Sequence, residues 1–220
     1  MSVKANIDKL RESVPANVKI VAVSKFHSND EILEVYNDGQ LLFGESRVQE
    51  LIVKQPTLPA DIKWHFVGSL QRNKVKFIAP FIHLIHSLDS ERLMREIEKQ
   101  AAVNNRKISC LLQLHVADEE TKSGFSPDEC RQFLAEGKWR ECKHVQLAGV
   151  MGMATFTEEM EQVRGEFRLI KSLFDEFKSQ HFSNDDNFKE ISMGMSGDYP
   201  IAIEEGATII RVGTLIFGER

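Results

Sequence analysis

Cysteine is scarce in this chain and is not arranged for metal or disulfide chemistry. The chain has three cysteines, Cys110, Cys130 and Cys142, an odd number, and no two of them have Cys-x-x-Cys spacing. Cys110 lies in an apolar run, where we expect a small buried hydrophobic residue. The pattern argues against a zinc site or a disulfide framework, and it favours a reducing compartment, so we expect a cytoplasmic protein.

Long apolar stretches and an excess of positive charge are also missing. No apolar run approaches the ~18 residues that a membrane span needs, and the segment from Met1 to Pro15 lacks the apolar core of a signal peptide. The net charge of −5 argues against a nucleic-acid binder held by bulk electrostatics. We therefore expect neither nucleic acid nor a membrane as a partner, and the composition, 42% hydrophobic and 28% charged, is typical of a globular chain.

What the chain does contain is a regular alternation of short β-type runs and helix-type segments. Strands are predicted at residues 19–24, 41–43, 63–67, 81–86, 108–115, 145–150, 188–192 and 208–212. Helices are predicted at residues 29–36, 46–54, 72–79, 90–103, 127–134, 158–180 and 199–205. One further amphipathic helix, over residues 3–13, precedes the first strand.

This alternation predicts the fold class. Strands that alternate with helices pair in parallel through right-handed crossovers, and eight such units are the number that closes a barrel. We therefore predict an α/β fold, a single (β/α)8 TIM barrel formed by residues 1–220 with an extra N-terminal helix. An open doubly wound sheet is the main alternative, although the chain has no GxGxxG loop of the dinucleotide-binding kind.

Lys25 follows the first predicted strand directly. Functional side chains of such barrels stand at the C-terminal ends of the strands. An isolated lysine at a strand end is usually just solvated. The alternative is an amine that the barrel mouth partly desolvates, which makes it nucleophilic toward an aldehyde.

Small and hydroxyl residues follow the last two predicted strands. Met195 and Ser196 lie in a glycine-rich turn after the seventh, and Gly213 and Thr214 follow the eighth. In many barrels these two loops bind a phosphate through backbone N–H groups, and Ser196 adds a hydroxyl at a helix start. A phosphate site opposite a strand-end lysine fits pyridoxal 5'-phosphate (PLP), which carries both an aldehyde and a phosphate.

Arg211 lies in the last predicted strand on the same face as Ile209, so it is predicted to point into the barrel, where an unpaired charge is costly. It could instead lie on the polar face or pair with an acid such as Glu45 or Glu219. The pyridine nitrogen of PLP would provide a partner. A permanently charged guanidinium there keeps that nitrogen unprotonated and makes the ring a weaker electron sink.

Other polar residues are weaker candidates. His83 and His86 are three apart in a predicted strand, so we expect them to point to opposite faces and not to share a metal. His65 is interpreted as a hydrogen-bonded packing residue. Lys74 and Lys122 could attract phosphate ligands, but solvated surface lysines are the usual case.

Several blocks of the sequence resemble the PLP homeostasis proteins, whose barrel is of the alanine-racemase N-terminal type. The blocks cover nearly the whole chain: 22–25 (AVSK), 43–50 (FGESRVQE), 64–74 (WHFVGSLQRNK), 122–125 (KSGF), 192–198 (SMGMSGD) and 211–220 (RVGTLIFGER). Two positions depart from the family pattern. Ser46, near the cofactor, usually is Asn, and Ser69 often is His.

The resemblance implies a Schiff base on Lys25, a phosphate site around Ser196, Gly213 and Thr214, and Arg211 at the ring nitrogen. The full predicted cofactor-binding set is Lys25, Ser46, Met195, Ser196, Arg211, Gly213 and Thr214. It also implies a cytoplasmic, non-catalytic protein that carries or buffers PLP and supports amino-acid homeostasis. PLP-dependent apo-enzymes and small amino acids are the further partners that this function suggests.

The alternative function is a PLP-dependent amino-acid racemase. Two-base racemisation needs an acid/base group on each face of the α-carbon, and Lys25 could serve one face. Full-length alanine racemases take the opposing tyrosine from a second domain. The chain stops at Arg220 after its eighth unit, so we expect that domain and its dimer interface to be absent, and a monomer. Neither Tyr36 nor Tyr199 lies in a block that suggests a second base, and a metal-dependent hydrolase lacks a convincing ligand set.

Overall fold

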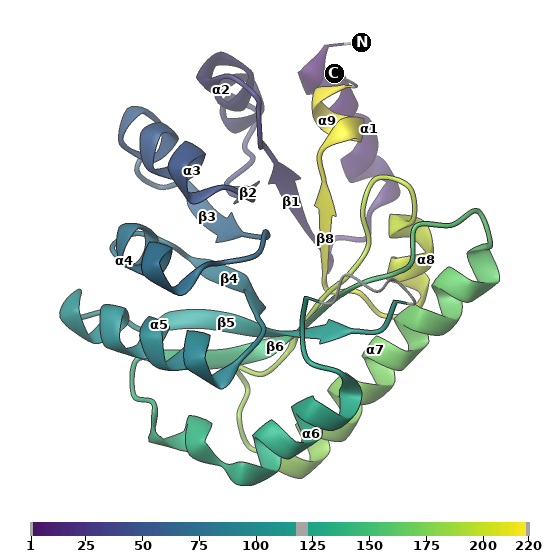
Figure 1. Cartoon of the computed structure of the whole chain (residues 1–220). Helices are drawn as coiled ribbons and strands as arrows, with labels where there is room; N and C mark the ends of the chain where they lie inside the picture. Colours follow the sequence, from purple (N-terminus) through teal and green to yellow (C-terminus); the bar gives the residue numbers. More distant parts are fainter. Residues whose placement is uncertain (1, 118–122, 219–220) are drawn as a thin grey trace.

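Eight parallel strands close into a barrel in the computed structural model of the chain, which describes residues 2–117 and 123–218 (Figure 1). The strands are β1 (Lys19–Val23), β2 (Leu42–Glu45), β3 (Lys63–Phe66), β4 (Leu84–Leu88), β5 (Ile108–His115), β6 (Val145–Met153), β7 (Glu190–Ser192) and β8 (Ile209–Val212). They follow one another in sequence order, and β8 closes the barrel by pairing with β1, where Val21 lies opposite Arg211. The predicted (β/α)8 barrel is confirmed, and the open doubly wound alternative is wrong.

Helices surround the strands (Figure 1). They are α1 (Val3–Ser13), α2 (Asn29–Asn37), α3 (Val48–Lys54), α4 (Val75–Ile78), α5 (Glu91–Val103), α6 (Pro127–Glu136), α7 (Met160–His181), α8 (Tyr199–Glu204) and α9 (Thr214–Phe217). The predicted extra helix is therefore present, and its Asn6 side chain donates to the Ile216 carbonyl of α9 at 3.0 Å. None of the helices within the described ranges is both long and apolar enough to span a membrane.

Local chemistry explains where several helices begin. Ser28 and Glu31 form a capping box at the start of α2, and Ser126 and Glu129 form another at α6. Each pair satisfies N–H groups that an uncapped first turn leaves without partners. Along α7, a buried stripe is formed by Val163, Phe167, Ile170 and Phe177, whereas Met160 at its start is exposed.

Differences from the prediction concern short elements. The helix expected over residues 72–79 is a 3-10 turn, Arg72–Lys74, followed by the single turn of α4. The 3-10 turns Gln55–Thr57 and Lys138–Glu141 and the helix α9 were not predicted, because elements of one turn carry too few residues for a periodic pattern. The fourth strand begins at Leu84 rather than at residue 81 and therefore leaves His83 outside it.

The interior of the barrel is only partly apolar. Its apolar layer consists of six buried side chains, Val21, Leu84, Leu111, Ala148, Met151 and Ile209. A much larger apolar core, which contains buried residues of both the strands and the helices, lies around it. The polar part of the interior is formed by His65, His86, Ser192 and Arg211, which are all buried.

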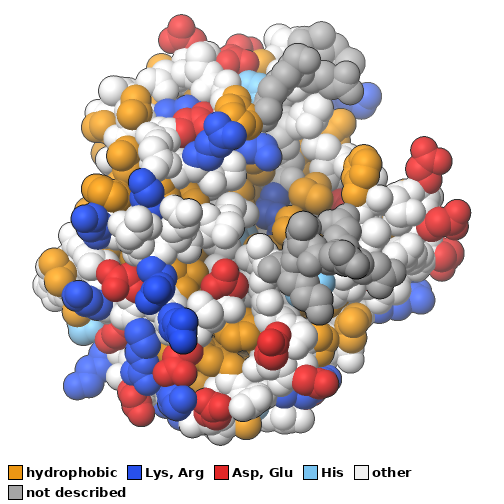
Figure 2. All heavy atoms as spheres, viewed as in Figure 1, with side chains coloured by type: hydrophobic (Ala, Val, Ile, Leu, Met, Phe, Trp, Pro, Cys, Tyr) orange, Lys and Arg blue, Asp and Glu red, His pale blue; other side chains and the backbone are white. Residues whose placement is uncertain are grey.

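The surface shows no separation of charge by sign. On the face that Figure 2 shows, acidic and basic side chains are interspersed over the helices at the lower left.

Candidate functional site

Lys25 lies in the turn that follows β1 and is half-buried. Phe26 next to it has a φ of +67°, a left-handed conformation that is uncommon for a bulky residue. Such a turn persists only where its surroundings hold it. The hydrogen bonds around the turn explain how the position of Lys25 is fixed.

A buried ion cluster, made of Lys54, Glu45 and Glu50, holds this turn. The Lys54 ammonium donates to the Ser24 carbonyl and to Glu45 Oε1, both at 2.8 Å, and to Glu50 Oε1 at 2.6 Å. Glu50 also accepts the Phe26 backbone N–H. Burial raises the pKa of Glu45 above its usual range, against the lowering effect of Lys54. The cluster fixes both residues that flank Lys25 without occupying the mouth of the barrel.

Sequence reasoning missed the ion cluster and misplaced one of its members. Glu45 was considered as a partner for Arg211, but it binds Lys54 and the Ser24 hydroxyl instead. The other acid considered, Glu219, lies outside the described residues. The sequence did contain one indication of this cluster, since Glu50 and Lys54 are four residues apart on α3, the spacing of an ion pair along a helix.

Two ring contacts tie the Lys25 turn to its neighbours. The Arg47 guanidinium lies 4.4 Å from the centre of the Phe26 ring, and His27 stacks on Phe217 of α9 with 4.4 Å between ring centres. The chain after β8 also approaches β1 closely, because a Cβ on Gly213 would lie 3.1 Å from the Val23 carbonyl oxygen. Lys25, Gly213 and Thr214, which are far apart in the sequence, therefore lie at the same part of the mouth.

The loops after β7 and β8 offer hydrogen-bond donors. Within the described part of the chain, the backbone N–H groups of Ser196, Gly197, Gly213 and Thr214 make no hydrogen bond, nor does the Ser196 hydroxyl. The loops are adjacent, since β7 pairs with β8 and the Arg211 N–H donates to the Gly194 carbonyl at 2.9 Å. The helices α8 and α9 that follow have six and four residues, so individual N–H groups rather than a helix dipole define the anion-binding capacity.

The remaining predicted residues lie around the same mouth. Ser46 directly follows β2 and is half-buried, and Gly68 packs so closely on it that a Cβ there would lie 2.4 Å from the Ser46 carbonyl oxygen. Met195 is 38% exposed, and Ser69 is exposed. Lys74 lies in the 3-10 turn before α4 with its ammonium 5.9 Å from the Phe77 ring, and Lys122 is outside the described residues.

Arg211 points into the barrel, as predicted, and is only 5% exposed. Its guanidinium donates to the Ser192 carbonyl at 2.8 Å, the Ser192 hydroxyl at 2.7 Å and the Gly152 carbonyl at 3.1 Å. Burial lowers its pKa to about 10, and the Asp198 carboxylate opposes that shift. Arg211 is therefore a buried cation that neutral oxygens hold in place.

From Arg211 a chain of hydrogen bonds, which we call the polar chain, runs through the barrel interior. Ser192 Oγ lies 2.9 Å from His86 Nδ1, and His86 Nε2 lies 2.8 Å from His65 Nδ1. His65 is thus the hydrogen-bonded packing residue that the sequence predicted. The prediction that His83 and His86 point to opposite faces was wrong, since both rings lie beside His65, with ring centres 5.4 and 5.1 Å from it. Regular strand alternation does not apply to His83, because it precedes β4.

Arg211 restricts the hydrogen-bond directions in the polar chain. A guanidinium can only donate, so the Ser192 oxygen accepts from it. A hydroxyl oxygen can accept twice and donate once, so the contact with His86 Nδ1 is compatible with either tautomer of His86. In the direction that starts from the serine hydrogen, His86 Nε2–H donates to His65 Nδ1, and His65 carries its own hydrogen on Nε2, a buried atom with no partner among the described residues.

Neutral buried histidines predict a pH-dependent stability. Burial lowers the pKa of His65 to about 3 and that of His86 well below its ordinary value. Below pH ~6.5 the histidines of the unfolded chain bind protons, whereas the two buried rings of the native protein stay neutral. The free energy of unfolding therefore falls as the pH drops from ~6.5 toward 3. Each ring contributes up to ~1.4 kcal/mol per pH unit.

The measurement is the urea midpoint at a series of pH values between 8 and 5. His65→Gln should reduce the slope of stability against pH by about one proton, while His115→Gln, outside the polar chain, should leave it unchanged. A wild-type stability that stays flat between pH 7 and 5 would contradict the prediction.

Metal and thiol chemistry find no support in the described residues. No group of three or more His, Cys, Asp or Glu side chains within residues 2–117 and 123–218 could hold a metal ion. Cys110 and Cys130 are buried, as expected for Cys110, and burial raises the pKa of the Cys130 thiol to about 12.

Comparison with known proteins agrees with this geometry. The family model described as alanine racemase, N-terminal domain, matches residues 1–220. The pyridoxal phosphate homeostasis protein of Aquifex aeolicus is 41% identical over 92% of this chain and 87% of that protein. The solved structure of PipY from Synechococcus elongatus with PLP bound has a TM-score of 0.88 and 34% identity, over 98% of this chain and all of PipY. An alanine racemase from Clostridium difficile, at 14% identity and a TM-score of 0.74, covers 100% of this chain and 57% of its own and shows the shared fold alone.

Proposed function

The chain belongs to the alanine racemase N-terminal domain family, and from that premise we propose that it binds PLP covalently, as a Schiff base on Lys25. One observation carries the proposal. The half-buried lysine after β1 shares the barrel mouth with two loops in which the backbone N–H groups of Ser196, Gly197, Gly213 and Thr214 have no partner among the described residues. An amine and an anion site at one mouth match the two reactive ends of PLP, an aldehyde and a phosphate. PipY, which is 34% identical to this chain and whose structure contains bound PLP, supports the proposal.

Each predicted residue has a role in this proposal. Lys25 supplies the amine, Ser196 a hydroxyl, and Gly213 and Thr214 backbone N–H groups for the phosphate. Ser46 and Met195 lie at the edge of the site, where Ser46 replaces the amide that the family usually has. Gly213 is required for close packing, because a Cβ there would contact β1.

Arg211 is proposed to contact the ring nitrogen of the cofactor. It remains charged at neutral pH, since its pKa of about 10 lies well above 7. A charged guanidinium can only donate, so the ring nitrogen has to accept and stay unprotonated. Bound PLP would supply an aldehyde that captures amines and a ring that withdraws electrons. Arg211 would weaken the electron withdrawal by the ring and leave the reactivity of the aldehyde unchanged.

We therefore propose a carrier or buffer of PLP rather than an enzyme. Residues 1–220 would act as one PLP-binding unit, monomeric and cytoplasmic, that supports intracellular PLP and amino-acid homeostasis. PLP-dependent apo-enzymes would accept the cofactor, and small amino acids would be able to displace Lys25. The name of the relatives, pyridoxal phosphate homeostasis protein, supports this function over amino-acid racemisation.

Replacing Ser196 tests the phosphate part of the site. Ser196→Ala removes one hydrogen bond to a charged group, so PLP affinity should fall by about 1.5–3 kcal/mol. Fold stability should hardly change, because the hydroxyl bonds to no described residue. Equilibrium titration with PLP measures the first quantity and thermal unfolding the second.

Ser183→Ala is the matched control, because Ser183 is an exposed loop serine between α7 and β7, at the other end of the barrel. It should leave PLP affinity unchanged. If Ser196→Ala keeps full affinity but lowers the melting temperature by several degrees, Ser196 has a structural role and the assignment is wrong.

A further inference from the structure

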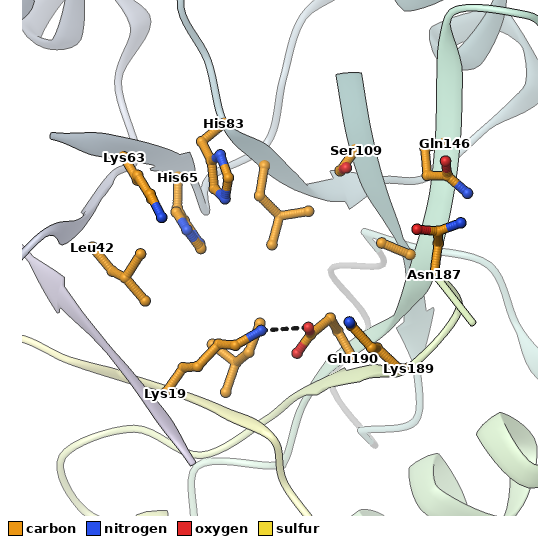
Figure 3. A pocket seen from close by; sticks show the side chains of 13 residues that line it. Lys19, Leu42, Lys63, His65, His83, Ser109, Gln146, Asn187, Lys189 and Glu190 are labelled. Atoms are coloured by element: carbon orange, nitrogen blue, oxygen red, sulfur yellow. Dashed lines mark hydrogen bonds and ion pairs between the residues drawn. The ribbon is translucent and has the colours of Figure 1, made fainter. Parts of the chain in front are cut away.

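A polar cavity lies at the opposite end of the barrel from Lys25. It has a volume of about 370 Å³, and its lining includes the first residues of β1, β3 and β4, Lys19, Lys63 and Leu84. The ammonium groups of Lys19, Lys63 and Lys189 point toward its centre (Figure 3). The volume falls within the range of about 300–1,000 Å³ that is typical of small-molecule sites.

The charges around this cavity do not balance. Lys19, Lys63 and Lys189 line it, and Glu190 is the one acid among its lining residues. Glu190 pairs with Lys19 (Figure 3), whereas Lys63 and Lys189 form no ion pair with any residue in the described ranges. Two ammonium groups are therefore left for a ligand, and the cavity has a positive surplus. Burial, with help from the charges of Lys63 and Lys19, lowers the pKa of His83 at the same site.

The inner wall of the cavity carries a buried ring nitrogen without a partner. Lys63 and His65 are two residues apart on β3, so both face the interior and His65 lies one layer deeper. His65 is the last residue of the polar chain, and its Nε2 atom is buried and makes no hydrogen bond to any described residue. A buried donor without a partner costs about 1–3 kcal/mol, and an acceptor that reaches it through the cavity removes that cost.

We propose that this cavity is a second ligand site, which binds the phosphate or carboxylate group of a small metabolite. The ammonium groups of Lys63 and Lys189 bind the oxyanion, and His65 Nε2–H donates to it from below. Ser109, Gln146 and Asn187, which also line the cavity, provide hydroxyl and amide contacts for the rest of the ligand. The site stands without the PLP proposal, because no residue of it takes part in the Lys25 mouth.

The test follows the imidazole ring signals of His65 and His83 by NMR. Inorganic phosphate is titrated into the purified protein, and succinate is titrated in a parallel arm. Saturable shifts of both ring signals with phosphate indicate a phosphorylated ligand. Saturation at a lower concentration of succinate than of phosphate indicates a dicarboxylate. Phosphate that binds at the Lys25 mouth is detected separately on the Ser196 and Thr214 amide signals, so the two sites are distinguished.

Lys63→Ala/Lys189→Ala should weaken binding at the cavity at least about tenfold, because it removes two charge-assisted contacts. Lys9→Ala/Lys99→Ala, which removes two exposed lysines outside the cavity, controls for net charge. In the ligand-free protein, ring nitrogen shifts should show His65 protonated on Nε2. The proposal is overturned by a proton on Nδ1, by the absence of saturable shifts in both arms, or by equal weakening in the control.

Discussion

Replacing Lys25 with alanine should abolish covalent retention of PLP. In the wild-type protein, borohydride should reduce the Schiff base to a stable amine, and the cofactor should remain on the peptide that contains Lys25. In Lys25→Ala no amine is available at the end of β1, so the adduct on that peptide should be lost completely. Visible absorption before and after reduction, followed by peptide mass mapping, measures both outcomes.

The fold should tolerate this change, because the turn is held by groups other than the Lys25 side chain. Lys54 binds the Ser24 carbonyl, and Glu50 accepts the Phe26 N–H. Lys74→Ala is the control, since Lys74 is another half-buried lysine, considered above for its attraction to phosphate ligands, and this variant should keep the adduct. A wild-type adduct found mainly on a lysine other than Lys25 would refute the assignment.

The fold was predictable because eight strand patterns alternate with seven helix patterns. Even the predicted strand at residues 108–115 matches β5 at both ends, and the helix at residues 3–13 matches α1. Errors arose where an element is too short to show a period, as with α4 and α9, or where a strand starts late, as with β4. Barrel closure itself depends on pairing between β1 and β8, which no local pattern contains.

The candidate site was predictable only in part. Position in the chain was enough to bring Lys25, Ser196 and Gly213 to one mouth, because all three follow the C-terminal ends of strands. The cluster around Lys54 and the polar chain through His86 were not predictable. Their partners are up to 106 residues apart and meet only after the barrel has closed.

Amino acids should react with the PLP-loaded protein, yet racemise poorly. Removal of the α-proton places negative charge on the substrate, and the cofactor ring stabilises that charge best when its nitrogen is protonated. Arg211, buried and held by Ser192 and Gly152, is proposed to keep the nitrogen unprotonated. An electron sink of this kind suits a protein that stores the cofactor more than one that catalyses with it.

Both tyrosines of the chain have hydrogen-bond partners of their own, and we expect neither to act as a second base. Tyr36 donates to Asp61 at 2.8 Å, and Tyr199 lies 3.1 Å from the Ser13 hydroxyl of α1. Both contacts are exposed on the surface of the molecule. Absence of one positioned acid/base group lowers a rate by about 10²–10⁴-fold.

We therefore expect the PLP-loaded protein to exchange the α-proton of L-alanine at least about 10²-fold more slowly than the ~10 s⁻¹ turnover of a typical enzyme. The measurement is α-deuteration and D-alanine formation in heavy water, with a visible spectrum taken at the start to show that L-alanine has displaced Lys25. Arg211→Glu would offer a carboxylate to the ring nitrogen and should speed the exchange, although burial of that acid requires a parallel check of thermal stability. If the wild-type protein racemises alanine near ~10 s⁻¹, the carrier proposal is wrong and the chain is an amino-acid racemase. A ring nitrogen that faces Arg211 would then suffice for catalysis.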